Sequence, residues 1–147
     1  MRILGLDFGS KTVGVAVTDP LGITAQGVEI VRRDRESKLR RTLARINEII
    51  EEYQVEEIVL GCPLNMDETE GERVRKTLEF KKLLEDRTHL TVHLQDERLT
   101  TVAADEILEE AGVRKADRSL YIDKVAAVLI LEDYLNNSEK KEKIQNL

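Results

Sequence analysis

Three acidic residues stand where a stable core would not normally place a carboxylate. Asp7 lies inside the apolar run RILGLDF, Glu97 follows a second apolar run, and Asp123 begins the apolar stripe of the last helical segment. Strands are depleted in Asp, and burying an unpaired carboxylate is costly. Misplaced acids of this kind often mark functional sites. We therefore take the three as candidates for one catalytic cluster.

Each acid also has a structural explanation when it is considered alone. Asp7 could cap the turn that follows it, Glu97 could be a surface acid paired with Arg98, and Asp123 suits the dipole of a helix first turn. The dipole does not explain why Asp123 falls on the inward face. All three positions are explained if the three carboxylates converge on one site that binds a divalent cation. Clustered carboxylates repel one another, and the cation relieves that repulsion.

An all-oxygen ligand set of this kind suits Mg²⁺ or Mn²⁺. Two such ions roughly 4 Å apart can clamp a phosphodiester, one activating water and the other holding the leaving oxygen. We therefore expect Asp7, Glu97 and Asp123 to be both the metal ligands and the catalytic residues of a nuclease.

Further residues are candidates for holding a nucleic-acid backbone. Asn65, in a polar loop after an apolar run, could bond a phosphate or a sugar, although Asn also favours plain turns. Lys11, Arg98 and the basic segments 32–45 and 113–118 are candidate phosphate contacts. These predictions rest on residue type and position alone.

The elements that must position these residues follow the order β-β-β-α-β-α-β-α-α. Strands are expected at residues 2–8, 13–18, 23–31, 57–62 and 90–95, and helices at residues 39–53, 71–86, 101–111 and 119–136. Short connections make the first three strands an antiparallel meander, and the later β-α-β units make strands one, four and five parallel. The carboxyl ends of strands one and four then form a natural ligand crevice.

Periodicity assigns faces to these elements. Asp7 shares a strand face with Gly5, and Asp123 shares a helix face with Ala126 and Ala127, whose small side chains let the helix approach the sheet closely. The apolar residues expected to face the core from the second helix are Val74, Leu78 and Leu83.

Length and composition limit the protein class. The 147 residues predict one globular α/β domain over residues 1–136, and the polar tail 137–147 is expected to fray. No stretch is long and apolar enough for a membrane span, and the N-terminus lacks a signal-peptide cleavage site. The single cysteine, Cys62, excludes an internal disulfide and is expected to be a small buried hydrophobe.

Charge is unevenly distributed along the chain. The net charge is −6, yet residues 31–45 hold seven basic and two acidic side chains. A basic patch can attract phosphate even on an acidic protein, although charge alone favours a solvated helix face. Aromatic residues make up only 3% of the chain, which argues against a platform that stacks successive bases.

Four motifs occur in a recognisable order: DFGSK from residue 7, GCPLNMD from residue 61, DERLTT from residue 96 and D-x-x-A-A from residue 123. Together they resemble the YqgF family of bacterial proteins, described as Holliday junction resolvases and pre-16S rRNA nucleases. The resemblance covers about residues 2–135. It implies a ribonuclease H-like fold, a metal-dependent site of Asp7, Glu97 and Asp123, and cytoplasmic trimming of the 5′ end of pre-16S ribosomal RNA, with ribosomal precursor particles as partners.

The sequence departs from the expected pattern at two points. Cys62 stands where an aliphatic residue is expected, and no second acid accompanies Asp123 on its helix face. Related junction resolvases use a further acid in the active site. Its absence here argues against junction cleavage more than against general nuclease chemistry.

The sequence suggests three other functions, of which the third is disfavoured. The chain could be a junction resolvase acting on branched DNA, or a non-catalytic ribosome-assembly factor that holds structured RNA. The run after Asp7 also resembles the first phosphate loop of actin-like kinases, but those proteins need a second lobe for which 147 residues leave no room.

Overall fold

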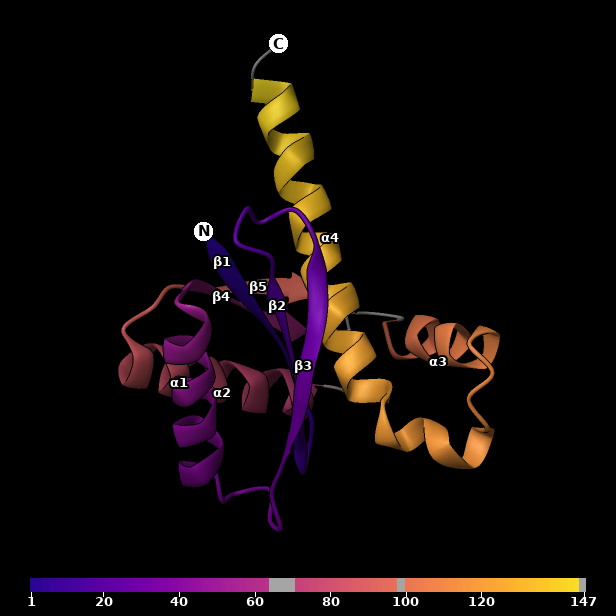
Figure 1. Cartoon of the computed structure of the whole chain (residues 1–147). Helices are drawn as coiled ribbons and strands as arrows, with labels where there is room; N and C mark the ends of the chain where they lie inside the picture. The colour runs from indigo at the N-terminus through magenta and orange to yellow at the C-terminus, as the bar shows by residue number, and fades with distance from the viewer. Residues whose placement is uncertain (64–70, 98–99, 146–147) are drawn as a thin grey trace.

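A five-stranded mixed sheet with helices on both faces forms the body of the protein (Figure 1). The computed structural model describes residues 1–63, 71–97 and 100–145, with side chains through residue 137. Its strands are β1 (Arg2–Phe8), β2 (Thr12–Thr18), β3 (Ala25–Arg32), β4 (Val55–Cys62) and β5 (Val92–Asp96). Its helices are α1 (Arg40–Tyr53), α2 (Gly71–Thr88), α3 (Thr100–Glu110), the 3-10 helix η2 (Lys115–Leu120) and α4 (Ile122–Gln145).

The strand order β3-β2-β1-β4-β5 confirms the predicted topology. β1 pairs antiparallel with β2 and parallel with β4, and β4 pairs parallel with β5. The carboxyl ends of β1, β4 and β5 therefore meet at one edge of the sheet, because parallel strands end on the same side. Asp7 and Glu97 come from this edge.

The larger core lies between the sheet and helices α1 and α2. Leu4, Leu6 and Phe8 point into it from alternate positions of β1, as the alternation predicts. Phe8 stacks on Phe80 of α2 with ring centroids 4.1 Å apart. This contact fixes the end of β1, next to Asp7, against α2.

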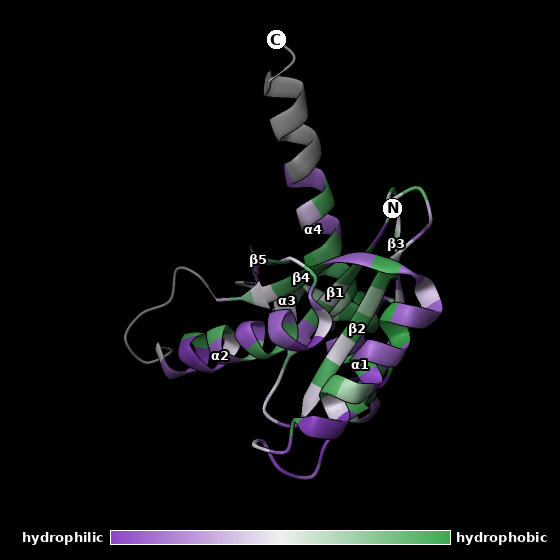
Figure 2. Ribbon diagram, turned by 90° about the vertical axis from the view of Figure 1, so that its left-hand side faces the viewer, coloured by the Kyte–Doolittle hydropathy of each residue, from purple (hydrophilic) through white to green (hydrophobic). Residues whose placement is uncertain are grey.

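The smaller core lies between the other sheet face and α4. A Cβ added at Gly5 would lie 3.0 Å from the Leu131 Cβ and 3.1 Å from the Ala127 carbonyl oxygen, so α4 sits directly on the β1 backbone. This confirms the predicted close approach of the last helix. Hydrophobic residues fill the central strands, whereas the helices alternate between hydrophobic and hydrophilic positions (Figure 2).

The predicted core face of α2 is wrong. Leu78 and Leu83 are 45% and 41% exposed, and the helix instead buries Thr77, Phe80 and Leu84. The stack of Phe80 on Phe8 sets the rotation of the helix, and the Thr77 hydroxyl is satisfied by donating to the Arg73 carbonyl at 2.9 Å. Apolar residues stand on two faces of this helix, so periodicity could not choose between them.

The ends of the last helix also differ from the prediction. Residues 115–120 form η2, so α4 begins at Ile122 rather than Ser119 and the segment 113–118 is only partly a loop. The helical backbone continues to Gln145, beyond the predicted end at Asn136. Helix α3 and η2 project sideways from the sheet and pack against α4 rather than against the strands (Figure 1).

The turn between β2 and β3 depends on Asp19, which gives a prediction for stability. Asp19 Oδ1 accepts hydrogen bonds from the backbone N–H groups of Thr24 at 2.8 Å and Ile23 at 2.7 Å. The bond from Thr24 is the main cause of a lowered pKa for this carboxyl. Its contribution to stability is therefore present above the ordinary carboxyl pKa and is lost as the pH falls through the lowered pKa.

We expect Asp19→Ala to lower the melting temperature near neutral pH, and the difference from wild type to shrink as the solution is acidified. Thermal denaturation followed by circular dichroism measures both effects. Asp86→Ala, at an exposed position of α2, is the matched control. An Asp19→Ala deficit that stays constant down to strongly acidic pH would contradict the role of the charged carboxylate.

Candidate active site

The side chains of Asp7 and Glu97 are hydrogen-bonded to each other at the carboxyl edge of the sheet. Asp7 is the penultimate residue of β1, and Glu97 directly follows β5, where its backbone N–H donates to the Cys62 carbonyl at 3.1 Å. Gly61 makes room for the pair, because a Cβ there would lie 2.9 Å from Glu97 Oε2. Two carboxyl groups can share a hydrogen bond only if one of them carries a proton.

The pKa of Asp7 is raised well above its usual range. Burial of the carboxyl is the largest cause, followed by the negative charge of Glu97 and the hydrogen bond with it. Asp123 raises the pKa further, and the positive charge of Arg73 opposes these effects. The fold thus concentrates negative charge at one point, where proteins place carboxylates mainly for chemistry or for binding a cation.

Asp123 is held beside this pair by contacts of its own. The Thr12 hydroxyl donates to Asp123 Oδ2 at 2.6 Å. The backbone of Asp123 rests on Gly14, where an added Cβ would overlap the Asp123 carbonyl group. Gly14 pairs with Asp7 across β1 and β2, so this contact brings the start of α4 to the Asp7 position.

The donor chemistry of this cluster fits a hard divalent cation. All three side chains offer oxygen, and a cation could replace the proton that Asp7 and Glu97 share. As they stand, Asp7 and Glu97 contact each other and Asp123 contacts Thr12. Accordingly, the described residues contain no group of three His, Cys, Asp or Glu side chains already arranged around a metal position. Ligation by all three therefore requires their side chains to turn toward a common point.

The structure describes only some of the other residues that the sequence analysis singled out. Lys11 is exposed in the turn that follows β1, at the same sheet edge as Asp7. Asn65 and Arg98 lie outside the described residues, so their roles stay predictions. Cys62 is fully buried, as expected, and burial raises the pKa of its thiol to about 11. A thiol with that pKa is protonated near neutral pH and is not a nucleophile.

Sequence reasoning missed three residues that shape the site. Thr12 orients Asp123, Gly14 admits the start of α4, and Arg73 places a positive charge near Asp7. Glycine inside a strand often signals a close backbone approach, so Gly14 carried a usable signal. Arg73 did not, because it is one of many charged residues on α2.

Comparison with protein families identifies the chain. The model of the family described as "RuvX: Holliday junction resolvase" matches residues 1–137. The chain belongs to the RuvX family. A relative from Agathobacter rectalis is 64% identical over 141 residues, which cover 94% of this chain and 99% of the relative. A relative from Streptococcus pyogenes is 50% identical over 139 residues, covering 94% and 99%. Both carry the name "Putative pre-16S rRNA nuclease", and the expected family is confirmed.

Solved structures confirm the ribonuclease H-like fold of this RuvX protein. RuvC of T. thermophilus in complex with a Holliday junction substrate superposes with a TM-score of 0.58 at 17% identity, covering 95% of this chain and 96% of RuvC. Fowlpox virus resolvase with junction DNA gives 0.54 at 12% identity, covering 93% and 98%. In the described part of the chain, no helix combines the length and apolar character that a membrane crossing requires.

The contact between Gly14 and Asp123 gives a test of how the site is built. We expect Gly14→Ala to push the start of α4 off the sheet and to destabilise the fold by about 1–3 kcal/mol, the usual range for overpacking. Chemical denaturation measures the loss, and amide chemical shifts of Asp123 and Lys124 report the displacement. Gly71→Ala is the control, because a Cβ at Gly71 meets nothing within 4 Å. Equal stability and unchanged Asp123 shifts in both variants would disprove the close contact.

Proposed function

We propose that this RuvX protein is a metal-dependent nuclease that hydrolyses phosphodiester bonds at the 5′ end of pre-16S ribosomal RNA in the cytoplasm. The observation that carries the proposal is the close pair of half-buried carboxyl groups of Asp7 and Glu97 at the carboxyl edge of the sheet, with Asp123 beside it. The names of the relatives from Agathobacter rectalis and Streptococcus pyogenes support the choice of RNA. Precursor particles of the small ribosomal subunit are the partners that this role requires.

In this proposal, Asp7, Glu97 and Asp123 hold Mg²⁺ or Mn²⁺. Bound there, the metal would activate water and stabilise the charge that builds up on the phosphate. Asp7 and Glu97 give up their shared proton and offer carboxylate oxygens, and Thr12 keeps Asp123 oriented by its hydrogen bond. Arg73 supplies a fixed positive charge near Asp7, which favours a phosphate group there.

The reaction is an in-line displacement at phosphorus. The oxygen of water forms the new bond to phosphorus, the bond to the 3′ oxygen breaks, and that oxygen takes a proton. The products carry a 5′-phosphate and a 3′-hydroxyl. We assign Lys11, Asn65 and Arg98 to contacts with the RNA backbone on either side of the reacting phosphate.

Asp7→Asn tests the catalytic role directly. We expect this variant to lose Mg²⁺- or Mn²⁺-dependent cleavage of a 5′ fragment of pre-16S RNA, because an amide is a poor cation ligand. We also expect a melting temperature equal to or above that of wild type, because the substitution removes like-charge repulsion. Asp86→Asn, at an exposed position of α2, is the matched control and should cleave normally. Full cleavage by Asp7→Asn would exclude the mechanism.

Metal removal provides an independent prediction. Dialysis of the wild-type protein against EDTA should abolish cleavage, and added Mn²⁺ or Mg²⁺ should restore it. Gel analysis of end-labelled RNA measures the cleaved fraction. Cleavage that persists in excess EDTA would rule out the metal dependence while leaving the family assignment intact.

A four-way DNA junction is the second candidate substrate, and the description of the matching family favours it. The same protein preparation can be offered a pre-16S RNA fragment and a four-way junction under identical conditions. A higher kcat/KM for the RNA supports the proposal, and a higher value for the junction replaces it with junction resolution. Tight RNA binding without cleavage at any metal concentration would instead identify a non-catalytic assembly factor.

A further inference from the structure

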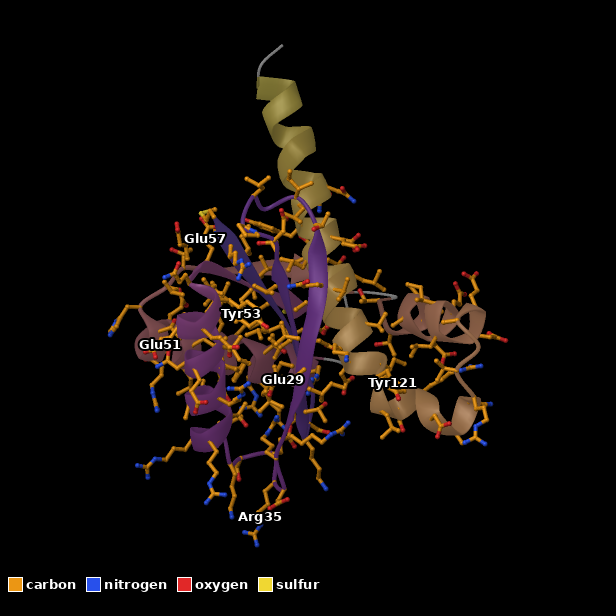
Figure 3. The ribbon with its side chains drawn as sticks, in the orientation of Figure 1. Glu29, Arg35, Glu51, Tyr53, Glu57 and Tyr121 are labelled. Atoms are coloured by element: carbon orange, nitrogen blue, oxygen red, sulfur yellow. The ribbon has the colours of Figure 1, made fainter. Side chains whose placement is uncertain are left out.

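A strongly basic pocket of about 440 Å³ lies between the end of β3 and the start of α1. Five basic side chains line it, together with one acid, Asp34; the basic residues are Arg32, Arg33, Lys38, Arg40 and Arg41. Arg35 marks this end of the molecule in Figure 3, where many side chains carry nitrogen at their tips. The pocket is separate from the three carboxylates. The sequence predicted only a broad basic segment at residues 32–45 and not this pocket.

Neighbouring acids balance only part of the positive charge of this pocket. In the described residues, Arg32, Lys38, Arg40 and Arg41 form no ion pair, as the salt bridges of this region show. The nearby carboxylate of Glu36 is taken by Lys76, with Nζ and Oε1 2.8 Å apart. Gathered cations repel one another, so an anion in the pocket would lower the energy of the folded protein.

The start of α1 adds to this positive potential. Its N-cap residue, Leu39, makes no side-chain capping bond, and its first turn contains no acidic residue. Arg40 and Arg41 occupy that turn, where the helix dipole favours negative charge. Stability alone would disfavour this arrangement, whereas unsatisfied N–H groups at a helix start bind anions well.

Arg33 is an independent observation that points to a ligand. The residue is only 9% exposed, and Nη2 donates to the Gly9 carbonyl at 2.7 Å while Nε donates to the Glu36 carbonyl at 3.1 Å. Its Nη1 is buried and has no hydrogen-bond partner within the described residues. A buried, charged donor without an acceptor is costly. Arg33 lines the pocket, so a small turn of its side chain toward a bound phosphate would give Nη1 an acceptor.

The pocket is connected to the carboxylate cluster through the turn between β1 and β2. The Arg33 backbone N–H donates to the Lys11 carbonyl at 2.9 Å, and the Arg33 guanidinium bonds Gly9, two residues after Asp7. The guanidinium groups of Arg33 and Arg73 lie 5.0 Å and 5.4 Å from the centroid of the Phe8 ring. Positive charge therefore extends from the pocket toward Asp7.

From these contacts we infer that the pocket binds a backbone phosphate of the same nucleic-acid strand whose reacting bond lies at Asp7, Glu97 and Asp123. The inference rests on the proposed function in taking a nucleic acid as the substrate and in placing its reacting bond at the three carboxylates. The pocket recognises the phosphate group and not the sugar or the base. It holds the strand in register while the carboxylate cluster does the chemistry.

The test is the binding of a fluorescein-labelled single-stranded RNA by the full chain in EDTA, followed by fluorescence anisotropy over a range of salt concentrations. We expect the double variant Arg40→Gln/Arg41→Gln to raise Kd about fivefold or more and to reduce the slope of log K against log salt by about 0.7, the value for one phosphate contact on a single strand. Both positions are exposed, and removing positive charge from a helix first turn should not harm folding.

The matched control is Lys82→Gln/Arg87→Gln, which removes two exposed basic residues from α2 and leaves the net charge equal to that of the pocket variant. Its Kd should stay within about twofold of wild type with an unchanged salt slope. Equal effects of the two double variants would overturn the inference, because binding would then depend only on overall charge. Lys38→Gln, ahead of the helix, is a further pocket variant and should weaken binding in the same direction.

Inorganic phosphate locates the site without any nucleic acid. Titration of ¹⁵N-labelled protein should shift the Arg33 side-chain Nε–H signal and the first backbone amides of α1, and these shifts should vanish in Arg40→Gln/Arg41→Gln. Shifts confined to other regions would disprove the pocket. A DNA strand of the same sequence should show the same dependence on the pocket, and dependence for RNA alone would contradict phosphate recognition.

These outcomes are distinguishable from failure of the proposed function. If the wild-type protein cleaves no nucleic acid but its binding depends on Arg40 and Arg41, the nuclease proposal fails and the phosphate pocket stands. If cleavage is normal and the pocket variant binds like the control, only the pocket inference fails.

Discussion

The proximity of Asp7 and Glu97 is the constraint on which the site depends. Two half-buried carboxyl groups in contact cannot both ionise cheaply, and the hydrogen bond between them requires a proton. A protein selected only for stability would gain by replacing one of them with an apolar or neutral residue. Their presence is explained if a cation takes the place of that proton during function.

Close backbone contacts convert this local pair into a three-carboxylate cluster. Gly61 leaves space for Glu97, and Gly14 lets the start of α4 rest on β2 so that Asp123 reaches the same sheet edge. On the opposite face of the sheet, the stack of Phe8 on Phe80 anchors the end of β1 that carries Asp7. The geometry of the site is thus set by packing on both faces of a single strand, with the basic pocket attached through the next turn.

The sequence predicted the strand order and the edge at which the acids meet, because alternation and β-α-β connection rules are local and strong. The predicted buried face of α2 was wrong. Apolar residues lie on two faces of this helix, and the contact between Phe8 and Phe80 determines which face is buried. It also could not show that Thr12 binds Asp123 or that Arg73 acts on Asp7, because those contacts join residues remote in the chain. Asn65 and Arg98 remain predictions.

The most direct test is a crystal of the full chain soaked in Mn²⁺ and measured at a wavelength where manganese scatters anomalously. The account predicts an anomalous peak bound by oxygens of Asp7, Glu97 and Asp123, with the hydrogen bond between Asp7 and Glu97 broken. Absence of a peak at saturating Mn²⁺, with Asp7 and Glu97 still bonded to each other, would contradict it. A peak held by other residues would contradict it equally.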